Sequence, residues 1–131
     1  GHATAFRVGH TDSLGYYPKE RDVLWNSLGN AGVRMYFSGH DHLYNRAHIT
    51  DQTGHTIYQV LTGAGGAPFN TWAPPYAEGT KVLNDYHDEG HYGYVLVTVD
   101  GPRVTMKWKA LLKTGVPDVW TTMDTLEYTV N

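Results

Sequence analysis

The first third of the chain alternates between apolar runs and helix-like spacing. Residues 5–9 form a short apolar run that predicts a strand. A helix is expected to begin at Pro18, because proline is tolerated at the first helical position, and to end between Gly29 and Gly32. Residues 33–38 are continuous and mostly apolar, as in a strand that is covered on both faces. Strand, helix and strand in this order predict a parallel βαβ unit.

The later part of the chain has the pattern of antiparallel strands. Strands are expected over residues 56–62, 92–99, 103–112 and 121–130, each bounded by turn residues. Between the first two, residues 63–90 read as a long loop that is rich in proline and aromatic residues. The fold class predicted is therefore α/β, a βαβ unit followed by antiparallel strands that form one layer of a sandwich.

Composition limits the partners and the kinds of metal site. The 131 residues contain no linker-like stretch, so residues 1–131 are expected to form a single domain. A formal charge of −3 gives no electrostatic case for nucleic acid or an anionic membrane, and neither is expected as a partner. Because the chain has no cysteine, a metal would be held by imidazole, carboxylate or amide groups, which suit Zn, Fe, Mn or Ni.

The motif that carries the most chemical information is Gly39-His40-Asp41-His42, directly after an apolar run. Side chains two positions apart share a side only while the backbone is extended, and Gly39 frees the chain to turn. Both imidazoles are therefore expected to face one pocket as metal ligands. The alternative is a pair of loop histidines that are hydrogen-bonded to backbone carbonyls.

The motif extends to Gly-His-x-His-x-Tyr-x-Arg through Tyr44 and Arg46. In this form it resembles the last metal motif of the calcineurin-like metallophosphoesterases, especially their purple acid phosphatase branch. Residues 60–66 and 91–97 are similar to the glycine-rich turn and the C-terminal strands of that branch. The resemblance covers nearly the whole chain, and it corresponds to the C-terminal half of the family's αββα sandwich.

The resemblance implies a metal-dependent phosphoesterase. In that family two metal ions, bridged by an aspartate and a hydroxide, hydrolyse a phosphate ester. Carried over to this chain, His10 and His40 would bind one metal and His42 the other, and Tyr44 and Arg46 would orient the substrate or stabilise the loop. For Arg46 a salt bridge or a carbonyl contact is an equal alternative. The metal would be Zn, Fe or Mn, with one or two ions in a complete site, and secretion or a periplasmic location would suit such a protein.

The chain also departs from the family pattern. The family's first three motifs, which supply the remaining ligands and the bridging aspartate, belong to the half that this chain does not match. Gly9-His10-Thr11-Asp12 stands where His-x-Pro is usual, which makes Asp12 an alternative ligand. Two close cations need bridging anionic oxygen, whereas three neutral imidazoles suit one cation with an open coordination position. We therefore expect at most one metal in this chain.

Two functions remain open at this point. The first is a phosphoesterase acting on a phosphate ester or releasing phosphate, completed by an N-terminal half or by a partner chain. The second is a non-catalytic metal-binding or assembly module, in which a bare sheet edge pairs with a second copy as a homodimer. The further pair His87 and His91 is expected to lie in a solvated loop and not in a second metal site.

Overall fold

The computed structural model describes residues 1–73, 76, 78–79 and 81–130, and it shows a mixed α/β chain composed mostly of strands. The elements, in chain order, are a 3-10 helix η1 (Leu14–Tyr16), α1 (Pro18–Asn30), β1 (Met35–Ser38), β2 (Tyr44–Thr50), β3 (Thr56–Thr62), β4 (Val82–Asp88), β5 (Gly93–Asp100), β6 (Arg103–Lys113) and β7 (Val119–Thr129). No helix among the described residues is long and apolar enough to cross a lipid bilayer.

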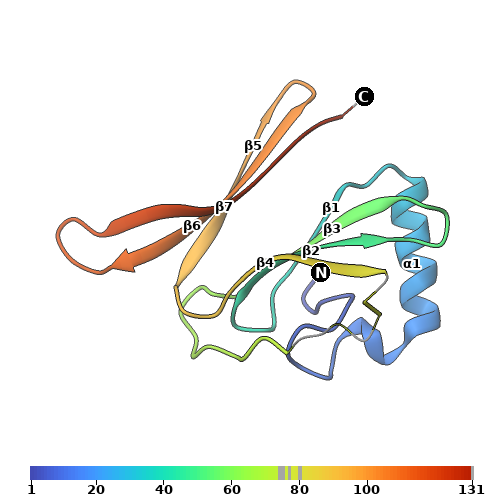
Figure 1. Ribbon diagram of the computed structural model, residues 1–131, viewed down its shortest axis with the longest axis horizontal. Coiled ribbons are helices and arrows are strands. Elements are labelled where there is room, and N and C mark those ends of the chain that lie inside the picture. The colour runs from blue at the N-terminus through green and yellow to red at the C-terminus, as the bar shows by residue number, and fades with distance from the viewer. Residues whose placement is uncertain (74–75, 77, 80, 131) are drawn as a thin grey trace.

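The strands form two sheets (Figure 1). In the four-stranded sheet the order is β1-β3-β2-β4, with β1 parallel to β3 and the other pairs antiparallel. The three-stranded sheet is antiparallel, in the order β5-β6-β7. The α/β class is thus confirmed at the level of mixed helix and strand content in two sheets.

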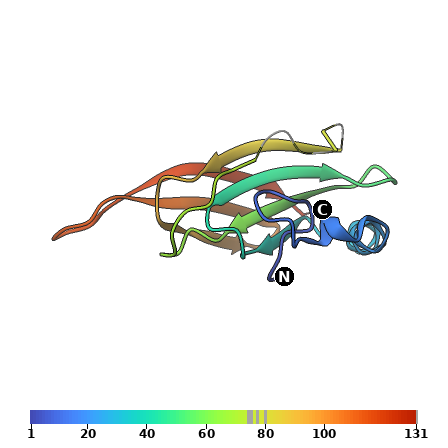
Figure 2. The ribbon, with the colours of Figure 1, turned by 90° about the horizontal axis from the view of Figure 1, so that it is seen from below.

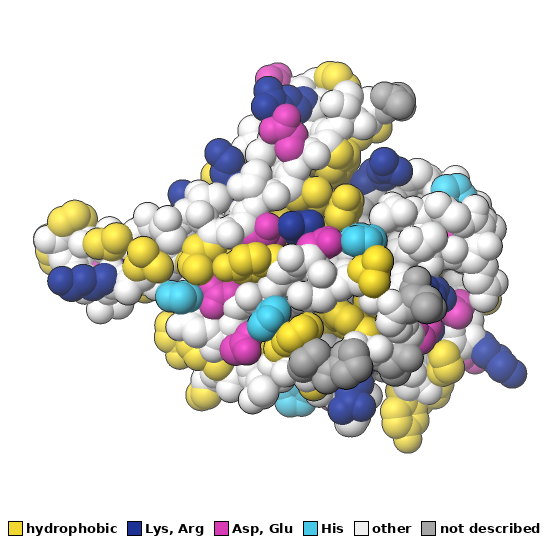
Figure 3. Space-filling model, viewed as in Figure 1, with side chains coloured by type: hydrophobic (Ala, Val, Ile, Leu, Met, Phe, Trp, Pro, Cys, Tyr) yellow, Lys and Arg dark blue, Asp and Glu magenta, His cyan; other side chains and the backbone are white. Residues whose placement is uncertain are grey.

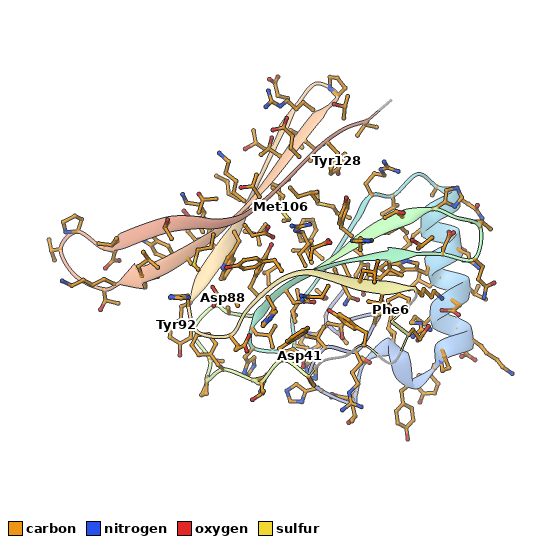
Figure 4. All side chains as sticks on the ribbon, in the orientation of Figure 1. Phe6, Asp41, Asp88, Tyr92, Met106 and Tyr128 are labelled. Carbon is orange, nitrogen blue, oxygen red and sulfur yellow. The ribbon has the colours of Figure 1, made fainter. Side chains whose placement is uncertain are left out.

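The two sheets share one hydrophobic cluster. Tyr44 and Val60 of the first sheet are buried against Met106 and Trp108 of β6, and the rings of Tyr44 and Trp108 stack with their centroids 4.4 Å apart. Figure 4 shows Met106 at the junction of the two sheets. Buried residues alternate along β6, as expected for a strand with one face in the core.

Helix α1 covers one side of the four-stranded sheet and is seen end-on at one end of the molecule in Figure 2. Its anchor is Trp25, which is fully buried with Ile49, Ile57 and Phe6. The helix begins at Pro18, as predicted. Because α1 has a single covered side, Val23 on its other side is two-thirds exposed.

The prediction of a strand at residues 5–9 is wrong, and so is the βαβ unit that depended on it. This segment is irregular, although Phe6 and Val8 are buried. The side chain of Gln59 replaces a neighbouring strand: its Oε1 accepts from the Ala5 and Phe6 amides, both at 2.8 Å, and its Nε2 donates to the Phe6 carbonyl at 2.9 Å. The parallel partner of β1 is therefore β3.

The predicted loop at residues 63–90 is also wrong in its last part, because β4 occupies residues 82–88 and pairs with β2. β4 is an edge strand in which most positions are exposed or half-buried. Its polar composition therefore resembles that of a loop. The strands predicted over 56–62, 92–99 and 103–112 are confirmed to within a residue or two, and β7 begins two residues before the predicted 121.

Candidate metal centre

Two loops bring a small cluster of metal-ligating side chains together. His10 and Asp12 lie on the segment that precedes η1, and His40 lies on the loop after β1. One potential ligand atom of each residue lies within 4.8 Å of the others. The rings of His10 and His40 have centroids 5.0 Å apart, and His40 Nε2 lies 2.9 Å from Asp12 Oδ2. The structure therefore assembles two imidazoles and one carboxylate.

The two loops are held together by Asp41, whose side chain is buried (Figure 4). Its Oδ1 accepts from the His10 amide at 2.8 Å, and its Oδ2 accepts from the Gly9 amide at 3.3 Å. The His10 ring is further oriented by Asn70, whose Oδ1 lies 3.1 Å from His10 Nε2. Asp41 and Asn70 therefore position His10 beside His40.

His40 has a left-handed backbone, with φ of 71°. The sequence led us to expect that Gly39 would make the turn. The residue with a positive φ at this turn is His40, and Gly39 does not have one. Such a φ is uncommon outside glycine, although histidine tolerates it better than most residues. The Gly39 amide donates to the His2 carbonyl at 2.9 Å, which fixes the turn from its other side.

The electrostatics of the cluster favour a cation. The hydrogen bond from His40, together with a backbone hydrogen bond, holds the pKa of the Asp12 carboxyl below its ordinary value, so Asp12 is a carboxylate at neutral pH. His10 and Asp12 are exposed and His40 is partly exposed, so solvent and ligands have access. Two imidazoles and one carboxylate fit Zn, Fe or Mn and leave coordination positions open.

His42 is not part of the group formed by His10, Asp12 and His40. Its Nδ1 lies 3.0 Å from the Pro68 carbonyl, and its amide donates to Asn70 Oδ1 at 2.7 Å. Such a contact is the backbone-bonded arrangement that the sequence left open as the alternative, and it is also the contact that commonly orients an imidazole ligating a metal through its other nitrogen. Because the left-handed turn at His40 breaks the extended backbone, side chains two positions apart no longer share a side.

Tyr44 and Arg46 join the two sheets and do not face the cluster. The Tyr44 hydroxyl, which is fully buried, donates to Asp124 at 2.7 Å. Arg46 donates to both carboxylate oxygens of Asp124, each at 2.8 Å, and to Asp85 at 2.9 Å. Burial opposes ionisation of Asp124, but these hydrogen bonds outweigh it and lower its pKa. These contacts correspond to the structural role that the sequence had left open for both residues.

The other histidine pair is separate and is occupied by local contacts. His87 Nδ1 lies 2.7 Å from Glu89, and His91 Nδ1 lies 3.1 Å from Asp88. Within the described part of the chain, these residues do not form a metal-binding group. His87 belongs to β4 and not to the loop that was expected there.

No protein-family model and no curated protein matches this chain. The residues that sequence reasoning missed are Asp41 and Asn70. Asp41 lies inside the motif, between the two histidines, and its carboxylate bonds to the loop that carries His10. Asn70 has no local signal, because its role depends on a loop folding back over the motif.

Proposed function

We propose that the chain is a metal-dependent phosphoesterase whose centre consists of His10, Asp12 and His40. The observation that carries the proposal is the convergence of these three side chains from two loops. The Gly-His-x-His-x-Tyr-x-Arg sequence and its resemblance to the metallophosphoesterases support a phosphate ester as the substrate. The C-terminal half of the αββα sandwich remains the fold that we propose on the same resemblance.

The charges of the ligands also suit a phosphate substrate. His10 and His40 are neutral when they ligate a metal, and Asp12 contributes one negative charge. A divalent cation held by these residues would keep a net positive charge, which attracts a phosphate dianion. The cation would supply Lewis-acid chemistry toward water and phosphoryl oxygen. Asp41 and Asn70 keep the His10 ring in place, so the ligand set needs little rearrangement to bind.

The geometry supports one metal in this chain. His42, which the resemblance assigned to a second metal, points to the Pro68 carbonyl. In the part of the chain that the structure describes, no second group of three ligand atoms accompanies it. A two-metal centre would therefore need carboxylates from an N-terminal half or from a partner chain, which we propose as the route to a complete family site.

The test combines metal content with turnover. Protein is loaded with Zn²⁺ or Mn²⁺, and metal per chain is measured by mass spectrometry and by calorimetric titration. Hydrolysis of p-nitrophenyl phosphate is then compared with free metal at the same concentration. We expect one metal per chain and a rate above free metal, and we expect both to be lost in His40→Ala and Asp12→Ala.

The matched control is His87→Ala, which removes a partly exposed histidine outside the cluster. This variant should keep the metal and the rate. Turnover no faster than free metal, or turnover that survives His40→Ala, would overturn the proposal for this chain. Loss of metal in His87→Ala would move the site to the other histidine pair.

The second candidate function is a non-catalytic metal-binding or assembly module. It is favoured by the hairpin of β6 and β7, which extends from the body with an apolar tip (Figures 1 and 3). The exposed apolar side chains on this hairpin are Leu112, Val116, Val119 and Trp120. This candidate predicts a dimer by light scattering, with bound metal and no turnover. A monodisperse monomer would exclude the homodimer.

A further inference from the structure

A hollow lies next to the proposed metal centre and shares Asp12 with it. Its volume is about 380 Å³, and its surface is mostly apolar. The side chains and backbone that line it come from one short stretch and one N-terminal residue: Ala3, Thr11, Asp12, Ser13, Leu14, Tyr16 and Tyr17. Among these described residues there is no lysine or arginine. The hollow therefore offers apolar contact and no charge to match a second phosphate.

Asp12 connects the hollow to the centre. Its carboxylate lies 2.9 Å from His40 Nε2, and the residue is also part of the lining of the hollow. A phosphate held at a metal on Asp12 would therefore have its ester group next to the hollow. Tyr16 and Tyr17 lie edge to face at 5.5 Å and give the hollow an aromatic wall, although both rings are largely exposed to solvent.

A second hollow, of about 330 Å³, shares Thr11, Ser13 and Tyr16 with the first and differs from it in the charged side chains of its lining. Its lining includes Arg21 and Glu78, which pair with each other at 2.7 Å, and Arg7. Asp12 is not part of its lining. The connection to the ligand cluster thus distinguishes the apolar hollow from its charged neighbour.

We infer that the centre takes phosphate monoesters of an aromatic alcohol, with the ring held between Tyr17, Tyr16 and Leu14. This inference rests on the proposed function. The volume is near the lower end of the roughly 300–1,000 Å³ typical of small-molecule sites, which favours a single ring over a nucleotide. The lack of positive charge in the lining argues against pyrophosphate and nucleoside polyphosphates.

The experiment measures binding, so that it does not depend on turnover. Phenylphosphonate and methylphosphonate are not cleaved, and each is titrated calorimetrically into the zinc-loaded protein. We expect phenylphosphonate to bind about tenfold more tightly, as an apolar pocket discriminates by the group that it buries. Tyr17→Ala should reduce this ratio to about one, and Tyr16→Ala should reduce it in part.

Two control variants test the location. Tyr94→Ala removes a half-exposed tyrosine of β5, in the other sheet, and Arg7→Ala removes a residue that lines only the charged hollow. Both should keep the tenfold preference. Circular dichroism confirms that each variant is folded, which is expected because the Tyr16 and Tyr17 side chains are mostly exposed.

The outcomes distinguish failure of this inference from failure of the proposed phosphoesterase function. Equal binding of the two phosphonates, or a preference that survives Tyr17→Ala, overturns the inference and leaves the phosphoesterase proposal standing. Binding of neither phosphonate to the zinc-loaded protein, together with no hydrolysis of p-nitrophenyl phosphate, overturns the proposed function itself. Loss of the preference in Arg7→Ala would assign the ring to the charged hollow and would also refute the inference.

Discussion

Replacement of Asp41 tests how the candidate centre is built. Its buried carboxylate accepts hydrogen bonds from the amides of Gly9 and His10 and joins the two loops that carry the ligands. A hydrogen bond to a charged group contributes about 1.5–3 kcal/mol. The bond to His10 is short at 2.8 Å, and the bond to Gly9 is long at 3.3 Å. We therefore expect Asp41→Ala to reduce the free energy of unfolding by about 3 kcal/mol.

The same change should weaken metal binding, because His10 would no longer be fixed beside His40. Removing a group that orients a ligand typically reduces metal affinity by about 10–100-fold. Asp41→Asn should have a smaller effect: its amide oxygen can still accept from His10, but its amino group would face the Gly9 donor. Urea denaturation and zinc titration of both variants measure the two effects separately.

The control is Asp51→Ala. Asp51 is another buried aspartate that accepts from two backbone amides, those of Thr53 and His55, both at 2.8 Å, but it lies in the turn between β2 and β3. The Asp51→Ala variant should lose about as much stability as Asp41→Ala, and its zinc affinity should stay unchanged. Unchanged zinc affinity in Asp41→Ala would show that Asp41 supports the fold only. Unchanged stability would refute the hydrogen-bond argument itself.

Three further predictions concern the fold. Gln59→Leu should lower the free energy of unfolding by about 4 kcal/mol and expose residues 1–10 to limited proteolysis. The reason is that the backbone groups bound by Gln59 would be buried without partners, and unchanged cleavage would contradict this. Gly63→Ala should destabilise the chain by about 2 kcal/mol in thermal denaturation, because a Cβ there collides with the Asp41 carbonyl; a neutral result would show that the loop can shift. Burial opposes ionisation of Asp51, but its hydrogen bonds from Thr53 and His55 hold its pKa at about 2. The stability that the Asp51 carboxylate contributes should therefore be present above about pH 4 and be lost as the pH falls towards 2. Asp51→Asn should remove that part of the pH dependence of the urea midpoint.

The elements that the sequence predicted well are those whose partners lie next to them in the chain. In β6, Val104, Met106, Trp108 and Ala110 are buried in turn, so the alternation seen in the sequence is the alternation of the strand. α1 is marked by Pro18 at its start. These signals are local and need no knowledge of the rest of the fold.

The elements that were mispredicted depend on distant contacts. Residues 5–9 have an apolar composition that suits a strand, but the group that satisfies their backbone is the side chain of Gln59, more than 50 residues away. β4 has a loop-like composition, but β2 offers it a free edge to pair with. In both places the backbone hydrogen-bond partner decides the structure, and a single stretch of sequence does not identify that partner.

The same reasoning applies to the two histidines of the motif, of which one joins the candidate cluster and the other lies against a backbone carbonyl. Spacing in Gly-His-x-His describes two side chains on an extended backbone, but the left-handed φ at His40 shows that the backbone of the motif is not extended. One then joins His10 and Asp12, some 30 residues earlier in the chain, and the other lies against the Pro68 carbonyl. The residue that holds the His10 loop at this turn is Asp41, which lies between the two histidines and whose carboxylate accepts from the His10 amide. The candidate cluster at this turn therefore depends on a buried tertiary hydrogen bond, which the two-residue spacing alone does not predict.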